Sequence, residues 1–511
     1  MNKSFFLLKI NIFAIKIFIC FVILFHSVIN PKESKSSTPA SITFVTHNEE
    51  NENYTNFNYY ILRRNIIVQL AEYVQLKGVK WDFQSDWKFL VAVKNFDTGS
   101  VILNTNGKNL LRWLVEDKGV SCDPHAHESQ YNYADVAYLH TQLGITPAKI
   151  VGGFLYDTIV GGNNWENLET GIYGRVFTSY FWKPDILWGG GTRNHLDDPQ
   201  NYGIWKPQSM ANFYVHDSTK HLTLIGNGCT NKIFDTTSVT TALNRVRFLI
   251  DAIKYNLIPD SGYYTSTVFM SVGQFNTSQL NKMKQFIDSV GVYVSQGRIQ
   301  WKSIKENYDY WNTGYGKNPF RLQCADLPTL YSKLNLTAAP QGFYNENVNR
   351  LNINDTFRVC LRNISSPYNI VDSSMALIDS VSLTGYFAFK NATSGTYYIS
   401  LKHRNSIETW SKSGGITFAM NSHMNYDLTS SVSQAYGNNL IPKGMKYCTY
   451  SGDTDQDGII DASDISIIDN DVILSLSGYL DSDLNGDYIT DAGDMSIAEN
   501  NSLNNIVKII P

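Results

Sequence analysis

The sequence has little cysteine, no excess of basic residues and, after its first 30 positions, no apolar run long enough to cross a bilayer. Lysine and arginine total 42 against 46 aspartate and glutamate residues, and the formal net charge is −4. A nucleic-acid-binding protein would be expected to carry a basic patch, so we expect no nucleic-acid partner. The length of 511 residues predicts roughly two to four domains.

The few cysteines are widely spaced. One of the 6 lies in the N-terminal apolar stretch, and the others are Cys122, Cys229, Cys324, Cys360 and Cys448. No pair has the C-x-x-C spacing of a zinc ribbon, and the number left is odd, so a fully paired disulfide framework is excluded. Roughly one or two disulfides at most can form, and the sequence does not assign them.

Residues 1–30 begin with a charged start and continue as an apolar run from Phe5 to Val28. Lys9 and Lys16 interrupt that run, which favours a signal peptide over a spanning helix. An uncleaved membrane anchor is the alternative. Residues 31–40 are polar and predict a linker. We therefore expect the protein to be extracellular or at the cell surface.

The predicted secondary structure changes once along the middle of the chain, from alternating strands and helices to strands alone. Residues 41–330 alternate strand-like and helix-like stretches with glycine stops, which predicts parallel βαβ units in a distorted TIM-like barrel. Residues 335–448 lose helical periodicity and predict an immunoglobulin-like or prealbumin-like β-sandwich. Its aromatic stretch, 398–410, could contact sugar, but a spacer is the simpler interpretation. The predicted fold class is therefore a multidomain chain in which an α/β region is followed by a β region.

Histidines and acids follow two of the predicted strands. The first cluster contains His47, Glu49 and Glu50, and the second contains Asp123, His125, His127 and Glu128. Barrel active sites form at the carboxyl ends of strands, so both clusters are expected at one site. His47, His125, His127 and Glu128 are the candidate ligands for Zn²⁺ or another divalent metal. Asp82 and Asp86 follow another strand and are secondary candidates.

At these residues the chain resembles the metal-dependent polysaccharide deacetylases, over about residues 41–325. The resemblance places Glu49 or Glu50 at that family's acidic motif and His125 with His127 at its histidine pair. Two features depart from the family. Its acidic motif carries consecutive aspartates, and its histidines are spaced His-x-x-x-His. The resemblance implies a secreted hydrolase that removes acyl groups from a polysaccharide or other glycan.

A deacetylase mechanism assigns roles by residue type. A metal would acidify water and polarise the acyl carbonyl. Glu49, Glu50 or Asp123 would act as general base, and His195 as general acid. Aromatic residues near His195 are candidates for a sugar-stacking wall, although a core position is the simpler interpretation for them: Trp188, Tyr202 and Trp205.

Two other functions fit the same residues. A carboxylate pair such as Glu49 with Glu128 could cleave a glycosidic bond without metal, and the separation of the two groups would set the stereochemical outcome. Alternatively, the chain is a non-catalytic surface protein that binds carbohydrate. Loss of activity on chelation would distinguish the first function, a deacetylase, from both alternatives.

An acidic loop occurs twice near the C-terminus, in residues 449–511. Each copy places oxygen side chains at loop positions 1, 3, 5, 9 and 12 and a backbone carbonyl at position 7, which is the EF-hand spacing for Ca²⁺. The candidate ligands are Asp453, Asp455, Asp457, Ile459, Asp461 and Asp464 in the first loop, and Asp483, Asn485, Asp487, Ile489, Asp491 and Asp494 in the second.

Each loop precedes a short apolar-periodic helix, and the flanking residues also match, so the unit is duplicated. A loop followed by a helix, twice, resembles the dockerin domain of extracellular carbohydrate-active proteins. The resemblance implies bound Ca²⁺ and a cohesin-like protein partner, or a unit that only caps the sandwich. Position 6 of the second loop is Tyr488 where glycine is usual, so we expect that loop to be strained and weaker.

Overall fold

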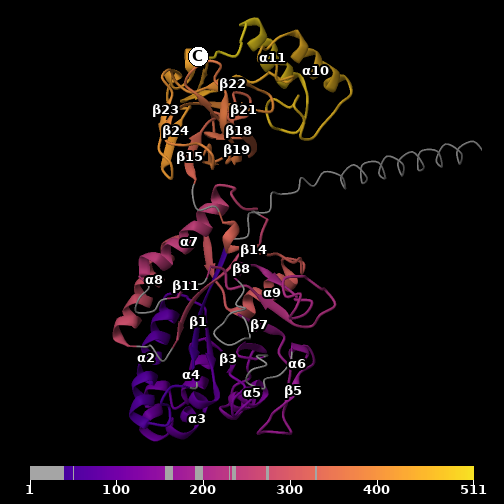
Figure 1. Cartoon of the computed structure of the whole chain (residues 1–511). Helices are drawn as coiled ribbons and strands as arrows, with labels where there is room; N and C mark the ends of the chain where they lie inside the picture. Colours follow the sequence, from indigo (N-terminus) through magenta and orange to yellow (C-terminus); the bar gives the residue numbers. More distant parts are fainter. Residues whose placement is uncertain are drawn as a thin grey trace, which may run out of the picture. The chain divides into compact units, whose positions relative to one another are not determined.

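The computed structural model shows a mixed α/β chain with a ten-stranded barrel-like sheet and a second, eight-stranded sheet (Figure 1). The predicted signal peptide and nearly all of the predicted linker lie outside the described residues. No helix in the described part of the chain is long and apolar enough to cross a membrane. The described residues are 40–49, 51–155, 165–189, 200–229, 231–232, 238–259, 261–271, 276–327 and 331–511.

The barrel-like sheet has the order β11-β12-β1-β2-β3-β4-β7-β10-β9, with β13 beside β1. The described strand pairs are parallel except β9 with β10, as the alternation of strands and helices predicts. The strands are β1 (Ala40–Asn48), β2 (Trp81–Ser85), β3 (Ser121–Ala126), β4 (Ile150–Gly153), β7 (Ile186–Trp188), β9 (Ile204–Trp205), β10 (Thr223–Ile225), β11 (Asn231–Lys232), β12 (Thr265–Ser271) and β13 (Ile299–Trp301).

Helices connect these strands, and most begin at a polar residue that accepts a backbone hydrogen bond from the first turn, such as Asp86 and Asn132. They are α2 (Phe57–Leu76), α3 (Trp87–Phe96), α4 (Leu110–Glu116), α5 (Tyr133–Gln142), α6 (Trp165–Thr170), α7 (Val239–Lys254), α8 (Thr277–Ser295) and α9 (Ile304–Thr313), with the 3₁₀ helix η1 (Gly99–Thr105) between α3 and α4.

Alternation along each strand sorts side chains between two cores. On β1, Phe44 packs with the helices in the larger core, whereas Val45 packs in a smaller core with Trp188 and Phe269. Because side chains two positions apart share a face, His47 lies on the same face as Val45. The fold therefore turns His47 toward the smaller core, where its ring contacts Trp188 and Phe269.

The second sheet differs from the predicted two-sheet sandwich. It is one continuous hydrogen-bonded path, β22-β21-β18-β19-β20-β15-β24 with β23 beside β21, and it curls around a single apolar core. Its strands are β15 (Ser332–Thr337), β18 (Asp355–Asn363), β19 (Ile370–Ile378), β20 (Thr384–Phe389), β21 (Gly395–His403), β22 (Ser406–Trp410), β23 (Ile416–Phe418) and β24 (His423–Asp427).

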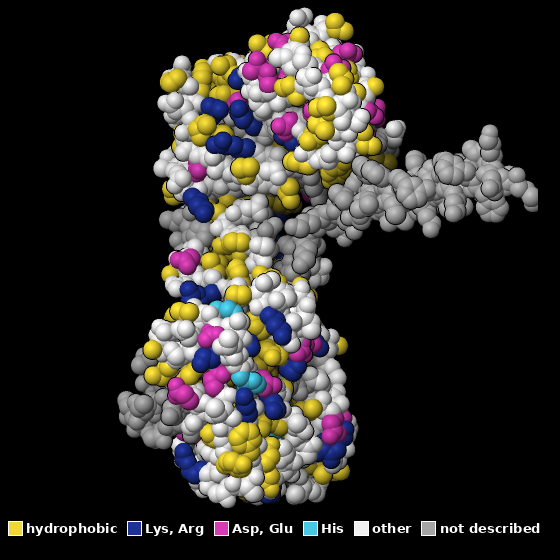
Figure 2. Space-filling view, turned by 90° about the vertical axis from the view of Figure 1, so that its right-hand side faces the viewer, with side chains coloured by type: hydrophobic (Ala, Val, Ile, Leu, Met, Phe, Trp, Pro, Cys, Tyr) yellow, Lys and Arg dark blue, Asp and Glu magenta, His cyan; other side chains and the backbone are white. Residues whose placement is uncertain are grey.

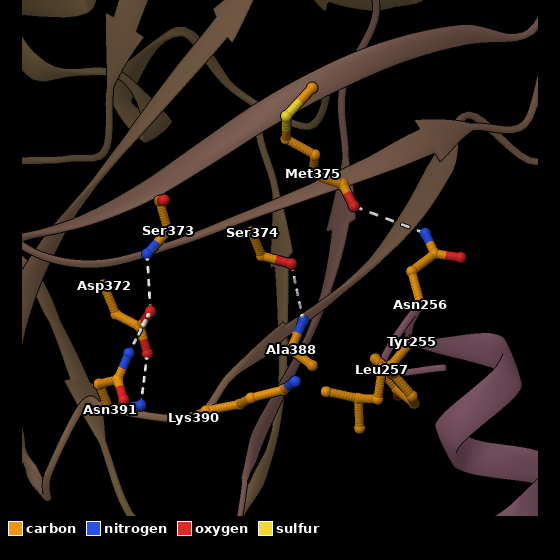
Figure 3. A pocket seen from close by; sticks show the side chains of 10 residues that line it. All are labelled: Tyr255, Asn256, Leu257, Asp372, Ser373, Ser374, Met375, Ala388, Lys390 and Asn391. Atoms are coloured by element: carbon orange, nitrogen blue, oxygen red, sulfur yellow. Dashed lines mark hydrogen bonds between the residues drawn. The ribbon is translucent and has the colours of Figure 1, made fainter. Parts of the chain in front are cut away.

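The link between β19 and β20 explains the difference. The two strands share one paired position, Ile378 with Gly385. Side chains on β19 extend the connection: Ser374 Oγ accepts a hydrogen bond from the backbone N of Ala388, and Asp372 Oδ2 accepts one from the backbone N of Asn391 (Figure 3). A strand-by-strand interpretation of sequence cannot see this junction, which joins what would otherwise be two sheets.

The remaining strands form small two-stranded pairs: β5 (Ile172–Tyr173) with β6 (Phe181–Trp182), β8 (Asn201–Tyr202) with β14 (Leu322–Gln323), β16 (Tyr344–Asn345) with β17 (Arg350–Leu351), and β25 (Ile441–Lys443) with β26 (Lys446–Cys448). Near the C-terminus, α10 (Ala462–Ile473) and α11 (Ala492–Leu503) pack over a small core of Ile468, Leu484 and Ala498. Cys229 and Cys324 form a disulfide with Cα atoms 5.6 Å apart, a pairing that the sequence left unassigned.

Candidate metal centre and calcium loops

Four of the predicted site residues meet at the ends of β1 and β3. The Nε2 atoms of His125 and His127 lie 3.1 Å apart. Glu49 Oε2 lies 3.0 Å from His127 Nε2 and 3.4 Å from His125 Nε2. Glu49 Oε1 lies 3.6 Å from His47 Nδ1. We call these residues, His47, Glu49, His125 and His127, the histidine–glutamate cluster.

The spacing within this cluster fits a single divalent ion. Ligand atoms of His47, Glu49 and His125 all lie within 4.8 Å of one another. Around tetrahedral zinc, with metal–nitrogen bonds of about 2.0–2.1 Å, neighbouring ligand atoms lie about 3.3–3.4 Å apart. Three of the distances within the cluster lie close to that value. The chemistry also fits, because imidazole and carboxylate are the ligands of catalytic zinc sites.

Burial and neighbouring charge favour the metal-binding protonation states of His125 and Glu49. Burial, and then the charge of His47, lowers the pKa of His125 to about 3. Burial alone would raise the pKa of Glu49, but the three histidines beside it hold that pKa well below its usual value. The result is a neutral His125 beside an ionised carboxylate, and these are the forms that coordinate a divalent ion.

Aromatic rings surround the cluster. The ring centroid of His47 lies 4.6 Å from that of Phe269 and 5.3 Å from that of Trp188. The His127 ring stacks on Phe154, with centroids 4.5 Å apart. An apolar shell of this kind limits solvent access and fixes ring orientation, and both effects tune a metal site.

Two predicted residues of the second cluster are engaged elsewhere. Asp123 accepts hydrogen bonds from the backbone N of Ala148 at Oδ1 and from Ser121 Oγ at Oδ2, and burial raises its pKa to about 6. Glu128 Oε1 accepts a hydrogen bond from Tyr133 N at the start of α5, and burial raises its pKa to about 8. The structure does not bring either carboxylate into the histidine–glutamate cluster.

The other predicted residues of the barrel site have different outcomes. Glu50 and His195 lie outside the described residues, so their predicted roles stay predictions. Trp188 borders the cluster but is buried. Tyr202 and Trp205 are each 1% exposed; the hydroxyl of Tyr202 contacts Cys229 Sγ, and Trp205 donates to a backbone carbonyl. Neither ring offers a face to a sugar, which removes the structural basis for a stacking role.

Strand β2 and the residue that follows it place two more polar groups near the cluster: Asp86, a secondary candidate from the sequence, and Gln84, which the sequence did not predict. Asp86 Oδ2 lies 3.3 Å from His127 Nδ1, on the side of the ring away from Glu49. Gln84 is fully buried in the sheet between β1 and β3. Asp82, the other secondary candidate, instead accepts hydrogen bonds from the backbone N of Ile304 at the start of α9. The signal for Gln84 was alternation along β2, which puts it on the same face as Asp82.

The two C-terminal loops have similar structures, in which several carboxylates lie close together. In the first, Asp464 Oδ1 accepts hydrogen bonds from the backbone N of Thr454 and Asp455. The matching residue of the second, Asp494, does the same for Leu484 and Asn485. Ligand atoms of Asp453, Asp455 and Asp457 lie within 4.8 Å of one another.

The crowding of carboxylates leaves the first loop electrostatically strained. Burial raises the pKa of Asp453 to about 7, and the nearby charges of Asp464, Asp457 and Asp455 act in the same direction. Clustered carboxylates of this kind are the expected setting for Ca²⁺, which takes six to eight oxygen ligands. An ion bound among them would relieve the repulsion.

The two loops use left-handed backbone at the same two positions but place glycine differently. In the first loop Gln456 has φ of 60° and Gly458 has φ of 95°. In the second loop Gly486 has φ of 76° and Tyr488 has φ of 67°. Tyr488 therefore occupies the backbone conformation that favours glycine, as the sequence predicted, and carries the associated strain.

A fixed cation also stands at the second loop. The guanidinium of Arg404 lies 3.6 Å from Asp483 Oδ2. An ion entering this loop must share the first carboxylate with that guanidinium, which weakens its attraction. Together with the strain at Tyr488, this arrangement makes the second loop the weaker expected calcium site.

No protein-family model matches the sequence, and no curated protein matches it. Among solved structures, a mutant type II cohesin–X–dockerin complex from Acetivibrio cellulolyticus is 16% identical over 35% of this chain and 97% of that chain, with a TM-score of 0.22. A candidate polysaccharide deacetylase from Mycobacterium smegmatis is 10% identical over 57% of this chain and 96% of that chain, with a TM-score of 0.32.

A third similar structure is a candidate glycoside hydrolase or deacetylase from Parabacteroides distasonis. It is 7% identical over 81% of this chain and 89% of that chain, with a TM-score of 0.34. These likenesses are remote, and they do not assign a reaction to this chain.

Proposed function

We propose that the chain is a secreted carbohydrate-active hydrolase that uses a divalent metal to remove acyl groups from a polysaccharide, and that its C-terminal loops bind Ca²⁺. The observation that carries the proposal is the histidine–glutamate cluster at the ends of β1 and β3, with the Nε2 atoms of His125 and His127 3.1 Å apart. The parallel order of the strands supports it, because active sites of barrels form at this end.

Each residue of the cluster has a defined task. His47, His125 and His127 would hold the ion with Glu49, whose two oxygens both face imidazoles. A divalent ion held there supplies Lewis acidity, which polarises a carbonyl and acidifies water. Glu49 is therefore assigned to the metal rather than to proton transfer. The role of general base stays with the predicted Glu50, and that of general acid with the predicted His195.

The surroundings of the cluster suit hydrolysis of an ester or amide. Phe154, Trp188 and Phe269 limit access of bulk water to the rings of His47 and His127. Electrostatic interactions become stronger in such an environment than in water. A metal-free glycosidase built on Glu49 and Glu128 has less support, because Glu128 is engaged with the first turn of α5.

Two features support an extracellular location and a protein partner. The disulfide between Cys229 and Cys324 is of a kind that persists in oxidising compartments. On the C-terminal repeat, Ile473 and Leu474 are 70% and 66% exposed. Figure 2 shows apolar and acidic side chains close together on the face that carries α10 and α11. Such a face suits a cohesin-like module, which we propose as the partner alongside a glycan substrate.

Metal analysis tests the central claim. Purified protein should contain about one zinc or similar ion per chain, and the double variant His125→Ala with His127→Ala should lose it. His221→Ala is the matched control, because His221 is 38% exposed and pairs with Asp185, outside the cluster. Retention of stoichiometric metal by the double variant refutes the ligand assignment.

Activity measurements then separate the reactions. A panel of acetylated glycans should lose acetate in the presence of the protein. A chelator should abolish this release, and Zn²⁺ or Co²⁺ should restore it. Release of reducing sugar that survives chelation would instead point to the glycosidase, and glycan binding without turnover would point to a binding protein.

A further inference from the structure

Strand β2 contributes no ligand to the histidine–glutamate cluster, yet it lies between the two strands that do. Its neighbours are β1, which leads to His47 and Glu49, and β3, which carries His125. In register, Gln84 lies level with His47 on one side and with Asp123 on the other. The inward side chains of β2 are therefore the nearest second layer around the cluster.

The carboxylate of Asp86 faces one of these imidazoles. Its Oδ2 lies 3.3 Å from Nδ1 of His127, while Nε2 of the same ring points to Glu49 and His125. A neutral imidazole that gives Nε2 to a metal carries its hydrogen on Nδ1, so it needs an acceptor there. Asp86 is 1% exposed, and its Oδ2 is the carboxylate oxygen that faces Nδ1 at ion-pair distance.

A second group on β2 stands beside the other histidine. Both amide atoms of Gln84 are buried without a hydrogen-bond partner, and so is Nδ1 of His125. A Cβ added to Gly152 would lie 2.7 Å from Gln84 Oε1 and 3.5 Å from His125 Nδ1, so the two groups flank the same glycine. A buried amide that satisfies no structural bond is costly unless it serves a neighbour.

We propose that β2 and the turn that follows it orient the metal centre: Asp86, the first residue after β2, fixes the ring of His127, and Gln84 supports that of His125, so that both present Nε2 to the ion. This inference rests on the proposed metal centre. Both are positioning residues, since neither reaches the ion itself. Partners of this kind raise ligand basicity and hold the tautomer, and their loss commonly weakens metal binding about 10- to 100-fold.

The main test uses Asp86→Asn, which keeps a helix N-cap for α3 but removes the carboxylate from His127. We expect the full chain to bind Zn²⁺ about 10- to 100-fold more weakly, measured by competition with a chromogenic chelator. The Co²⁺-loaded variant should also show an altered d–d absorption spectrum, which a change in global stability does not produce. Gln84→Met should weaken Zn²⁺ binding by a smaller factor.

The control is Asp82→Asn, on the same face of β2 but bonded to Ile304 N. It should leave the affinity for Zn²⁺ unchanged, and circular dichroism should show that all variants are folded. If Asp86→Asn does not fold, Asp86→Ser, which also caps a helix, replaces it. Wild-type affinity in the folded Asp86 variant overturns the orienting role alone. Absence of metal from the wild-type protein overturns the metal centre and this inference with it.

Discussion

Replacing Gly458 with alanine should weaken calcium binding at the first loop. Gly458 has φ of 95°, a conformation in which an L-residue costs about 1–2 kcal/mol. A Cβ would lie 3.2 Å from Nζ and Cε of Lys508, the movable end of a flexible side chain, so sterics add little. Gly458 N also donates to Asp453 Oδ1, so a shifted backbone would disturb a ligand. A loss of about 1–2 kcal/mol corresponds to roughly 5- to 30-fold weaker binding.

Calorimetric titration of the calcium-depleted chain measures this effect. The titration uses chains that also carry Asp483→Ala. This substitution removes the first carboxylate of the second loop, so that the measured calcium affinity is that of the first loop alone. Tyr488→Ala, measured with the second loop intact, is the matched control. It changes the same loop position at a residue that already has φ of 67°, and it should alter calcium affinity little. Unchanged or tighter binding by Gly458→Ala would refute the assignment of this glycine to a calcium loop.

Two further predictions concern the barrel-like sheet and its helices. Burial lowers the pKa of His140 to about 4, so the unfolded chain takes up its proton first and stability falls as pH drops from about 6.5 toward 4. His140→Leu should remove about 2 kcal/mol of that loss between pH 7 and pH 4.5, seen as a smaller difference between urea unfolding at the two pH values, and an equal difference contradicts it. Arg64→Met should cost about 3–5 kcal/mol, because it leaves the buried carboxylate of Asp97 without its cation. Adding Asp97→Asn should recover part of the loss in denaturant titrations, and a single-variant loss below about 1 kcal/mol would contradict the pairing.

The parallel sheet was predictable because its signal is local. A short stretch of periodic hydrophobic residues indicates each strand and helix, and glycines mark the ends of these stretches. The second sheet was less predictable. Whether its strands form two sheets or one depends on the junction of β19 with β20, which rests on Ile378, Gly385 and the side chains of Asp372 and Ser374. Those contacts join positions whose pairing no local pattern specifies.

The residues of the candidate site likewise fall into those that the sequence predicted and those that it did not. His47, Glu49, His125 and His127 could be placed together because each lies at or just beyond the carboxyl end of a strand, and parallel strands end at one edge. Asp123 was expected to follow a strand, but it lies inside β3, two positions before His125, and its side chain bonds to Ala148 N and Ser121. Position along the strand, which a motif does not record, separates ligands from structural carboxylates.

Glu128 was misplaced for a different reason. It stands next to His127 in the chain, but a left-handed backbone at Glu128, with φ of 53°, turns its side chain to the first turn of α5. Adjacency in sequence gives no information about such a turn. Gln84 was missed because glutamine carries no metal-binding signal of its own. Gln84 lies near the cluster only because β2 lies between β1 and β3 in the sheet.

The candidate metal centre and the C-terminal acidic loops fix nearby carboxylates in the same way. Asp86 accepts a hydrogen bond from Trp87 N at the start of α3, which leaves Oδ2 directed at His127. Asp464 accepts one from Asp461 N in the capping box of α10, which leaves Oδ1 for the loop backbone. A helix N-terminus attracts a carboxylate and restricts its rotation before any ion arrives. In both places, therefore, folding of the helix orders an acidic group in advance, so that an ion held nearby would need to supply less binding free energy for that ordering.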